Sequence, residues 1–380
     1  MSLDHQQYVD FIKKHAPAAV RSSLLQANSK PYVPKDIPIR GKPPKIFATY
    51  YSMPDWLDIF SSPPKSLASP KVRLDSRLGN TPFDRVIAEY KHAAQKHQEK
   101  VAACLDLIDP LPCGKALLAE LGATEHSVRI MPYWHFFRTV QRAEYFNSTS
   151  IPVGPRESLS YIADGTVRDY EDAYEKNAPV RDGDNTPFGS EKGTGKGANV
   201  VLFFSAEIWE SKGAPKGPGF KPDEVLFHEL VHITRMIRGR FTHVKVEGKG
   251  GYGNIEEYFA TVISNVYMSD KGQTALRGFY SDDLIQENRR RVNIGKEEIM
   301  VITDPLPKDW SVMEDPDNFY NNPDKLNIPP RQLMQIFKDK QPDFYFALAH
   351  LPEIKPKFNP VGQHFRENFH HAQVPRSKRP

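Results

Sequence analysis

The sequence predicts an α+β fold, because stretches with the apolar spacing of helices occur together with short apolar runs typical of strands. Its 33 prolines concentrate toward the two ends, where they favour extended, loop-like chain. We therefore expect three parts: a Pro-rich N-terminal arm over 1–80, a central folded domain over 81–300, and a Pro-rich C-terminal extension with one helix over 301–380.

The predicted elements of the first half follow in order along the chain. A short amphipathic helix is expected over Gln6–His15, and a long helix begins at a proline and covers Pro82–Leu107. A second helix, Cys113–Gly122, ends at a glycine. The apolar segments His126–Trp134 and Asn199–Phe204 are predicted strands, so the strands are expected to be fewer and shorter than the helices.

The second half contains the most strongly predicted helix, Pro222–Arg238. Proline suits its first turn, two acidic residues complement its positive N-terminus, and Gly239 ends it. A glycine-rich loop separates this helix from a second one over Ile255–Met268. One further helix, Pro330–Leu351, is expected in the C-terminal extension.

The composition argues against several classes of protein. With 39% hydrophobic and 26% charged residues, it is that of a soluble globular protein, and no apolar run predicts a membrane span. The first residues lack the apolar core of a secretory signal peptide, so we expect a cytoplasmic protein or one secreted by a signal-peptide-independent route. A net charge of +4 gives little reason to expect nucleic-acid binding. The two cysteines are expected to be buried and reduced.

The segment FHELVHITRMIRG contains an HExxH pattern in the middle of the strongest helix. His228 and His232 are four residues apart, so both imidazoles can point at one position beside the helix. Glu229 lies about 100° around the helix, where it can reach a water at that position without being a ligand. Buried ionisable groups need partners, and zinc would be a partner for all three. A zinc site is therefore preferred over two hydrogen-bonded core histidines.

A catalytic zinc usually has three protein ligands and an open position. Arg238 stands where one family pattern has its third histidine, and the surroundings of His243 do not suit a ligand. The remaining candidates are Glu256 and Glu257, at the start of the helix in NIEEYFATVISN. Glu256 lies at the edge of the apolar face, whereas Glu257 shares a face with small side chains that would let two helices approach closely. Periodicity alone leaves the choice between these two open.

These motifs carry a resemblance to a known class. A HELxH sequence followed by a glycine and then by a Glu-Glu pair resembles the gluzincin zinc peptidases. It is similar in particular to the clostridial neurotoxin light chains and to bacterial effector peptidases. The matching positions are His228, Glu229, Leu230, His232, Gly239, Glu256 and Glu257. In the neurotoxin pattern the second glutamate is the ligand, which favours Glu257 here and gives Glu256 a supporting position beside the ligands.

The resemblance implies a zincin-like catalytic domain over 81–300, with a mixed sheet over the HExxH helix and a mostly helical lower part. Zinc would be the cofactor, and Glu229 would act as general base. Arg277 and Tyr280 would stabilise the oxyanion, with Tyr252 as a competitor and a packing or surface role for the first pair equally expected. The strand Asn199–Phe204 would be the sheet edge that pairs with an extended substrate.

The resulting hypothesis is a zinc endopeptidase that acts on a specific protein target as an effector or toxin. Its partners would be a protein or peptide substrate in a host or competitor, with no nucleic acid. Two alternatives remain open: a housekeeping intracellular metallopeptidase, and a non-catalytic protein-binding module stabilised by zinc. The presence of Glu229 disfavours the second alternative, because a structural zinc site is normally closed by four ligands and needs no base.

Overall fold

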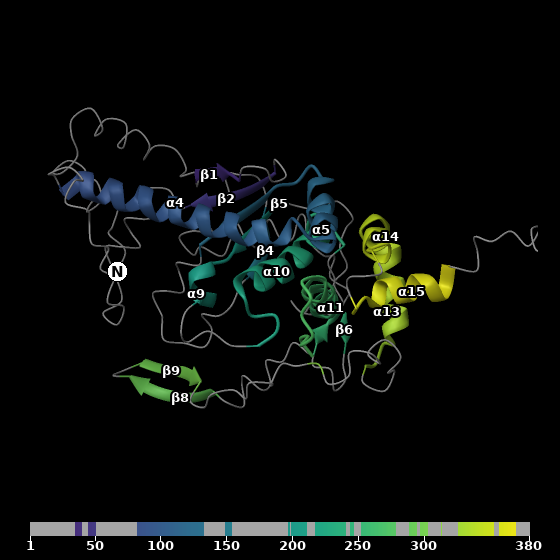
Figure 1. Ribbon diagram of the computed structural model, residues 1–380. Helices are drawn as coiled ribbons and strands as arrows, with labels where there is room; N and C mark the ends of the chain where they lie inside the picture. The colour runs from purple at the N-terminus through teal and green to yellow at the C-terminus, as the bar shows by residue number, and fades with distance from the viewer. Residues whose placement is uncertain are drawn as a thin grey trace, which may run out of the picture.

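The structure is a computed structural model (Figure 1). It describes residues 35–39, 45–50, 82–132, 149–153, 197, 199–210, 217–240, 244–246, 252–278, 289–294, 297–302, 313, 326–352 and 357–369. The predicted helix Gln6–His15 and the side chains of His243 and Tyr280 lie outside these residues. Among the described helices, none has both the length and the apolar composition that crossing a membrane requires.

A five-stranded mixed sheet forms the upper layer of the molecule (Figure 1), in the order β1-β2-β3-β5-β4. Its strands are β1 (Lys35–Pro38), β2 (Ile46–Tyr50), β3 (Val128–Met131), β4 (Thr149–Val153) and β5 (Asn199–Phe203). The three central strands β2, β3 and β5 are parallel, and antiparallel strands flank them on both sides. Together with the helices, this sheet agrees with the predicted α+β class.

The edge of this sheet differs from the sequence-based expectation. β5 lies inside the sheet, between β3 and β4, so the prediction that Asn199–Phe204 forms the edge was wrong. β4 takes that position, and Ile151 of β4 pairs with Val201 of β5. Pro152 lacks an amide hydrogen, which is tolerated in an edge strand but not in a central one. The short segment TSIPV was overlooked because nothing in its neighbourhood predicts a strand.

The N-terminal part also differs from a simple Pro-rich arm. Within 1–80, β1 and β2 belong to the main sheet, and β2 pairs in parallel with β3. Ala48, Thr49 and Tyr50 of β2 are completely buried, which explains why this apolar run packs as a strand despite the prolines around it. Residues of the predicted arm thus contribute two strands to the main sheet.

One helix, α10 (Pro222–Met236), lies at the centre of the helical layer. It packs against β4 and β5 and against four helices, namely α4 (Pro82–Ile108), α5 (Pro112–Gly122), α9 (Ala206–Glu210) and α11 (Ile255–Asp270). A small ribbon of β6 (Lys245–Val246) and β7 (Gly253–Asn254) leads into α11, and β8 (Arg289–Ile294) and β9 (Glu297–Ile302) form a separate hairpin. Cys104 and Cys113 are buried and free in this layer, as expected.

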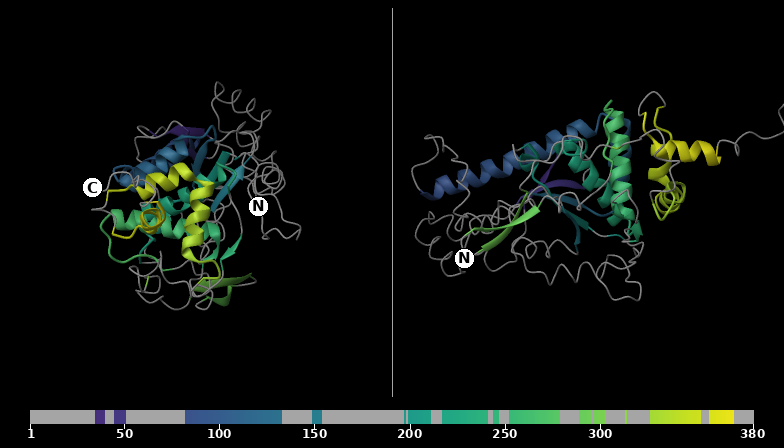
Figure 2. Two further views of the ribbon diagram at one scale, coloured as in Figure 1. Left: turned by 90° about the vertical axis from the view of Figure 1, so that its right-hand side faces the viewer. Right: turned by 90° about the horizontal axis from the view of Figure 1, so that it is seen from below.

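The C-terminal extension contains three described helices where one was predicted. They are α13 (Pro330–Lys340), α14 (Pro342–Ala349) and α15 (Pro360–Phe369). The predicted helix Pro330–Leu351 breaks at Gln341, whose φ of −140° and ψ of 64° are not helical. Pro342 causes this break, because a proline disfavours helical backbone in the residue before it. Figure 2 shows the three helices grouped beyond α11, and α14 packs against α5.

Candidate metal centre

Helix α10 is an interior helix, because every residue from Asp223 to Met236 is buried. Its N-terminus is fixed by charged contacts: Lys271, which follows the last residue of α11, lies 2.5 Å from the carboxylate of Asp223 and 3.1 Å from that of Glu224. At its other end the backbone turns at Gly239, whose φ is 58°. The ionisable groups in its middle are therefore held in a low-dielectric environment, where each needs a partner.

His228 and His232 point at the same position beside α10, as the spacing predicts. Their Nε2 atoms lie 3.2 Å apart, and both residues are buried. An imidazole Nε2 offers a lone pair when the ring is neutral and carries its hydrogen on Nδ1, so two such atoms at this distance can form half of a tetrahedral ligand set.

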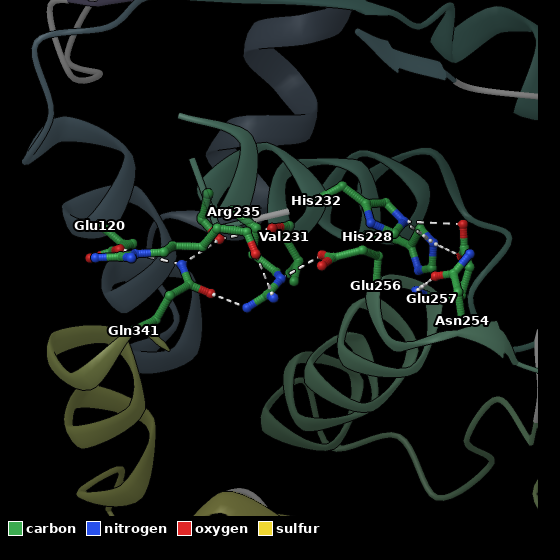
Figure 3. A network of polar contacts seen from close by, with 11 residues as sticks. Glu120, His228, Val231, His232, Arg235, Asn254, Glu256, Glu257 and Gln341 are labelled. Carbon is green, nitrogen blue, oxygen red and sulfur yellow. Dashed lines mark hydrogen bonds and ion pairs between the residues drawn. The ribbon is translucent and has the colours of Figure 1, made fainter. Parts of the chain in front are cut away.

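Glu257 supplies the third group from the first turn of α11. Its Oε2 lies 3.2 Å from Nε2 of His228, and its Oε1 lies 3.4 Å from Nε2 of His232 (Figure 3). The side chain of Asn254 accepts a hydrogen bond from the backbone N–H of Glu257 at 2.9 Å and so caps the helix. Among the described residues, the ligand atoms of His228, His232 and Glu257 form a group that could hold a metal ion.

Glu256 points the other way, although it precedes Glu257 directly. Its Oε2 accepts a hydrogen bond of 2.5 Å from Nε of Arg235, and both side chains are 1% exposed. Figure 3 shows the two adjacent glutamates directed to opposite parts of α10. The structure thus brings Glu257, and not Glu256, to the histidines.

The electrostatics of the three groups are strongly coupled. Burial lowers the pKa of His228 to about 4. Burial also lowers the pKa of His232, but the Glu257 carboxylate outweighs this effect and raises it to about 9. Burial raises the pKa of Glu257, but the charge of His232 and hydrogen bonds from both histidines hold it well below its usual range. The directions of these shifts favour a charged Glu257 beside a protonated His232, and a neutral His228.

Glu229 lies between the histidines in the sequence and is 9% exposed. Its charge contributes to the raised pKa of His232. A carboxylate in this position can exchange a proton with a water at the metal position.

Arg277 also lies near the centre, whereas its predicted companion Tyr280 is outside the described residues. Its charge lowers the pKa of His228, and its guanidinium lies 5.1 Å from the ring centre of Phe220. Asn265 fixes its backbone: the amide group of Asn265 accepts from the Arg277 N–H at 2.9 Å and donates to its carbonyl at 2.7 Å. The competing Tyr252 is buried and donates its hydroxyl hydrogen to the Gly278 carbonyl at 3.1 Å.

Several residues around the centre were missed by the sequence analysis. The helix-capping Asn254 could have been found, because asparagine just before a helical pattern is a start signal. Arg235 and Gln341 carry no such local signal, since their positions depend on contacts between segments far apart in the chain.

Comparison with known families matches residues 85–263 to the model of the Peptidase M91 family, described as an effector protein. The matched segment begins in α4 and ends in α11, so it contains α10, both histidines and Glu257. The match supports an effector peptidase, and such a peptidase has a protein substrate. No curated protein and no solved structure matches the chain significantly.

Proposed function

We propose that the chain is a zinc-dependent endopeptidase of the zincin type that acts as an effector or toxin on a specific protein target. The convergence of two imidazole nitrogens and one carboxylate beside a buried helix carries this proposal. The effector peptidase match over the same residues supports it independently.

The donor set fits zinc. Ligand atoms about 2.0–2.1 Å from a tetrahedral zinc lie about 3.4 Å apart. The two histidine Nε2 atoms lie 3.2 Å apart, and each lies 3.2–3.4 Å from one of the two carboxylate oxygens of Glu257. Two histidines and one glutamate leave a fourth position for water or substrate, which is typical of catalytic and not of structural zinc sites. A closed site would need a fourth protein ligand, and the described cluster contains three residues.

Each polar side chain then has a defined task in peptide hydrolysis. Zinc at this position supplies a Lewis acid that polarises the peptide carbonyl and lowers the pKa of water. Glu229 takes a proton from the attacking water and later delivers it to the leaving amine. We assign Arg277, together with Tyr280, to the oxyanion, because the positive charge of Arg277 acts on His228.

The substrate would bind as an extended strand along the outer edge of β4. β4 is the outermost strand on this side of the described sheet, and α10 packs against both β4 and β5. A peptide that adds to β4 would form backbone hydrogen bonds there and lie beside the metal centre. This replaces the role expected for the interior strand β5.

The experiment that tests this function compares Glu229→Gln with the wild-type chain. New N-termini are labelled and counted by mass spectrometry after each protein is added to a cell lysate, and zinc content is measured in parallel. We expect Glu229→Gln to retain about one zinc per chain and to lose cleavage by at least about 10²-fold. Equal cleavage patterns in the variant and the wild type would overturn the peptidase proposal. A zinc-loaded wild type without any cleavage would favour the binding-module alternative.

A further inference from the structure

We propose that Gln341 is a positioning residue for the metal centre. It acts through Arg235 and Glu256 on Glu257, and so makes the C-terminal helices part of the site. The inference rests on the proposed metal site, and it concerns residues beyond the 85–263 match. A positioning role is proposed because the hydrogen bonds of the Gln341 amide go to Arg235, Glu120 and Thr234, and not to the three candidate ligands.

The first link connects the two ligand-bearing helices. Arg235 lies one turn beyond His232 on α10, and its Nε donates to Glu256 on α11. The metal centre and this ion pair therefore join the same two helices. Their residues lie one turn apart on α10 and are adjacent on α11. The guanidinium also lies 4.8 Å from the ring centre of Phe259, which restricts its plane.

The second link connects Glu256 to Glu257. Successive residues of a helix point about 100° apart, so the direction of one side chain depends on the rotation of the helix about its axis. The contact with Arg235 fixes the direction of Glu256, and the cap from Asn254 fixes the first turn. Together they determine where the carboxylate of Glu257 meets His228 and His232.

The third link is Gln341, which reaches this ion pair from the C-terminal helices (Figure 3). Its Oε1 accepts from Nη1 of Arg235 at 3.2 Å, and its Nε2 donates to Thr234 at 3.1 Å and to Glu120 at 3.4 Å. Pro342 keeps Gln341 out of the helix, and the residue is 3% exposed. Its amide thus has polar partners on both α10 and α5.

Loss of this amide would release the guanidinium. Arg235 would keep its contacts with Glu256 and with the Arg240 carbonyl, but Nη1 would lose the acceptor that Gln341 provides. A buried charged donor without an acceptor is unfavourable, so the guanidinium would shift toward other acceptors. Glu256 would move with the guanidinium. The carboxylate of Glu257 would then be held less firmly in its position beside His228 and His232.

The test is zinc affinity of the full chain, measured by competition with a chromophoric chelator. Gln341→Met keeps the volume of the side chain and removes its hydrogen bonds. Groups that support metal ligands typically change metal affinity by 10–100-fold, and we expect about 10-fold weaker zinc binding, at the low end of that range. Gln335→Ala is the matched control, because Gln335 is a partly exposed residue on α13 whose amide donates to Asp339. We expect unchanged zinc affinity for this control.

A second measurement separates positioning from general stability. The visible absorption of the cobalt-substituted protein reports ligand geometry, and we expect it to change in Gln341→Met but not in Gln335→Ala. A Gln341→Met protein that is less stable but keeps wild-type zinc affinity and cobalt spectrum would overturn the inference. If Gln341→Met does not fold, Gln341→Asn replaces it, because the shorter side chain keeps an amide but withdraws its oxygen from Arg235. About 10-fold weaker zinc binding in Gln341→Asn would support the inference, and wild-type zinc affinity would overturn it.

These outcomes are distinct from failure of the proposed function. A wild-type chain that binds no zinc would remove the metal site itself. A wild-type chain that binds zinc, with affinity independent of Gln341, would leave the proposed function intact and remove only the positioning role.

Discussion

Two polar clusters lie between α10 and α11, one turn apart along α10. They compensate the free-energy cost of burying polar groups in different ways. In the metal centre, two imidazole nitrogens and a carboxylate converge on one position, and all three can present lone pairs there once His232 loses its proton. In the cluster of Arg235, Glu256 and Gln341, each contact joins a donor to an acceptor. The first arrangement calls for a cation, whereas the second is complete in itself. Burial alone therefore does not distinguish a functional polar cluster from a structural one, but the balance of donors and acceptors does.

Among the changes that would distinguish the two clusters, we expect the largest effect from Glu257→Ala, which should lose its metal. Removing this carboxylate leaves two histidines, and we expect the purified protein to lose its zinc, as in His228→Ala. Metal content by atomic emission measures this directly. Zinc retained in Glu257→Ala would show that another group completes the ligand set.

Glu256→Ala should have its main effect on folding. Arg235 cannot lose its proton, so removal of Glu256 leaves a buried charge without its ion-pair partner and should lower the free energy of unfolding by about 3–5 kcal/mol. Metal-free Glu257→Ala should cost only about 1 kcal/mol, because His232 can become neutral when its partner is removed. Denaturant unfolding of the metal-free proteins compares the two. Equal losses would contradict the distinction between the clusters.

The pH dependence of zinc binding should report the metal centre alone. Zinc must displace the proton of His232, whose pKa is about 9, whereas His228 is already neutral above its pKa of about 4. Affinity should therefore rise about 10-fold per pH unit from pH 5 to pH 8 and level off above pH 9, with about one proton released per zinc. Competition titrations at several pH values, with calorimetry in two buffers, measure both quantities. A flat profile over this range would refute the ion-pair description.

The smallest expected effect concerns the helix cap. Asn254→Ala should lower the free energy of unfolding by about 1 kcal/mol and weaken zinc binding, because the cap holds the backbone of Glu257. Asn359→Ala is a matched control: Asn359 accepts from the Gly362 N–H at 2.9 Å near the start of α15, away from the centre. It should lower stability without changing zinc affinity. Equal zinc affinity in the two variants would limit Asn254 to a capping role.

The sequence predicted the local parts of this site and missed the long-range ones. The helix of HExxH and its two converging histidines follow from spacing within one element, and both are present. Glu256 and Glu257 could not be separated by periodicity, because the deciding contact comes from Arg235 on another helix. The family resemblance favoured Glu257, and the structure brings that residue to the histidines. Its role as a ligand stays a prediction.

The errors in the fold have identifiable causes. The break between α13 and α14 follows from Pro342, a signal that was present in the sequence but was outweighed by the apolar spacing on both sides. The edge position of β4 could not be predicted, because strand order depends on pairing between segments far apart in the chain. The role of Tyr280 stays a prediction, and so does the division of the chain into three parts.

The contact between Arg235 and Gln341 joins residues 106 positions apart, and it bears on how the protein is made. A ribosome adds about 5–20 residues per second, so His232 emerges several seconds before Gln341. A zinc ion that met the growing chain in this interval would find the two histidines before the helices that fix Glu257 were complete. We therefore expect loading with metal to be the last step of maturation, after the end of translation.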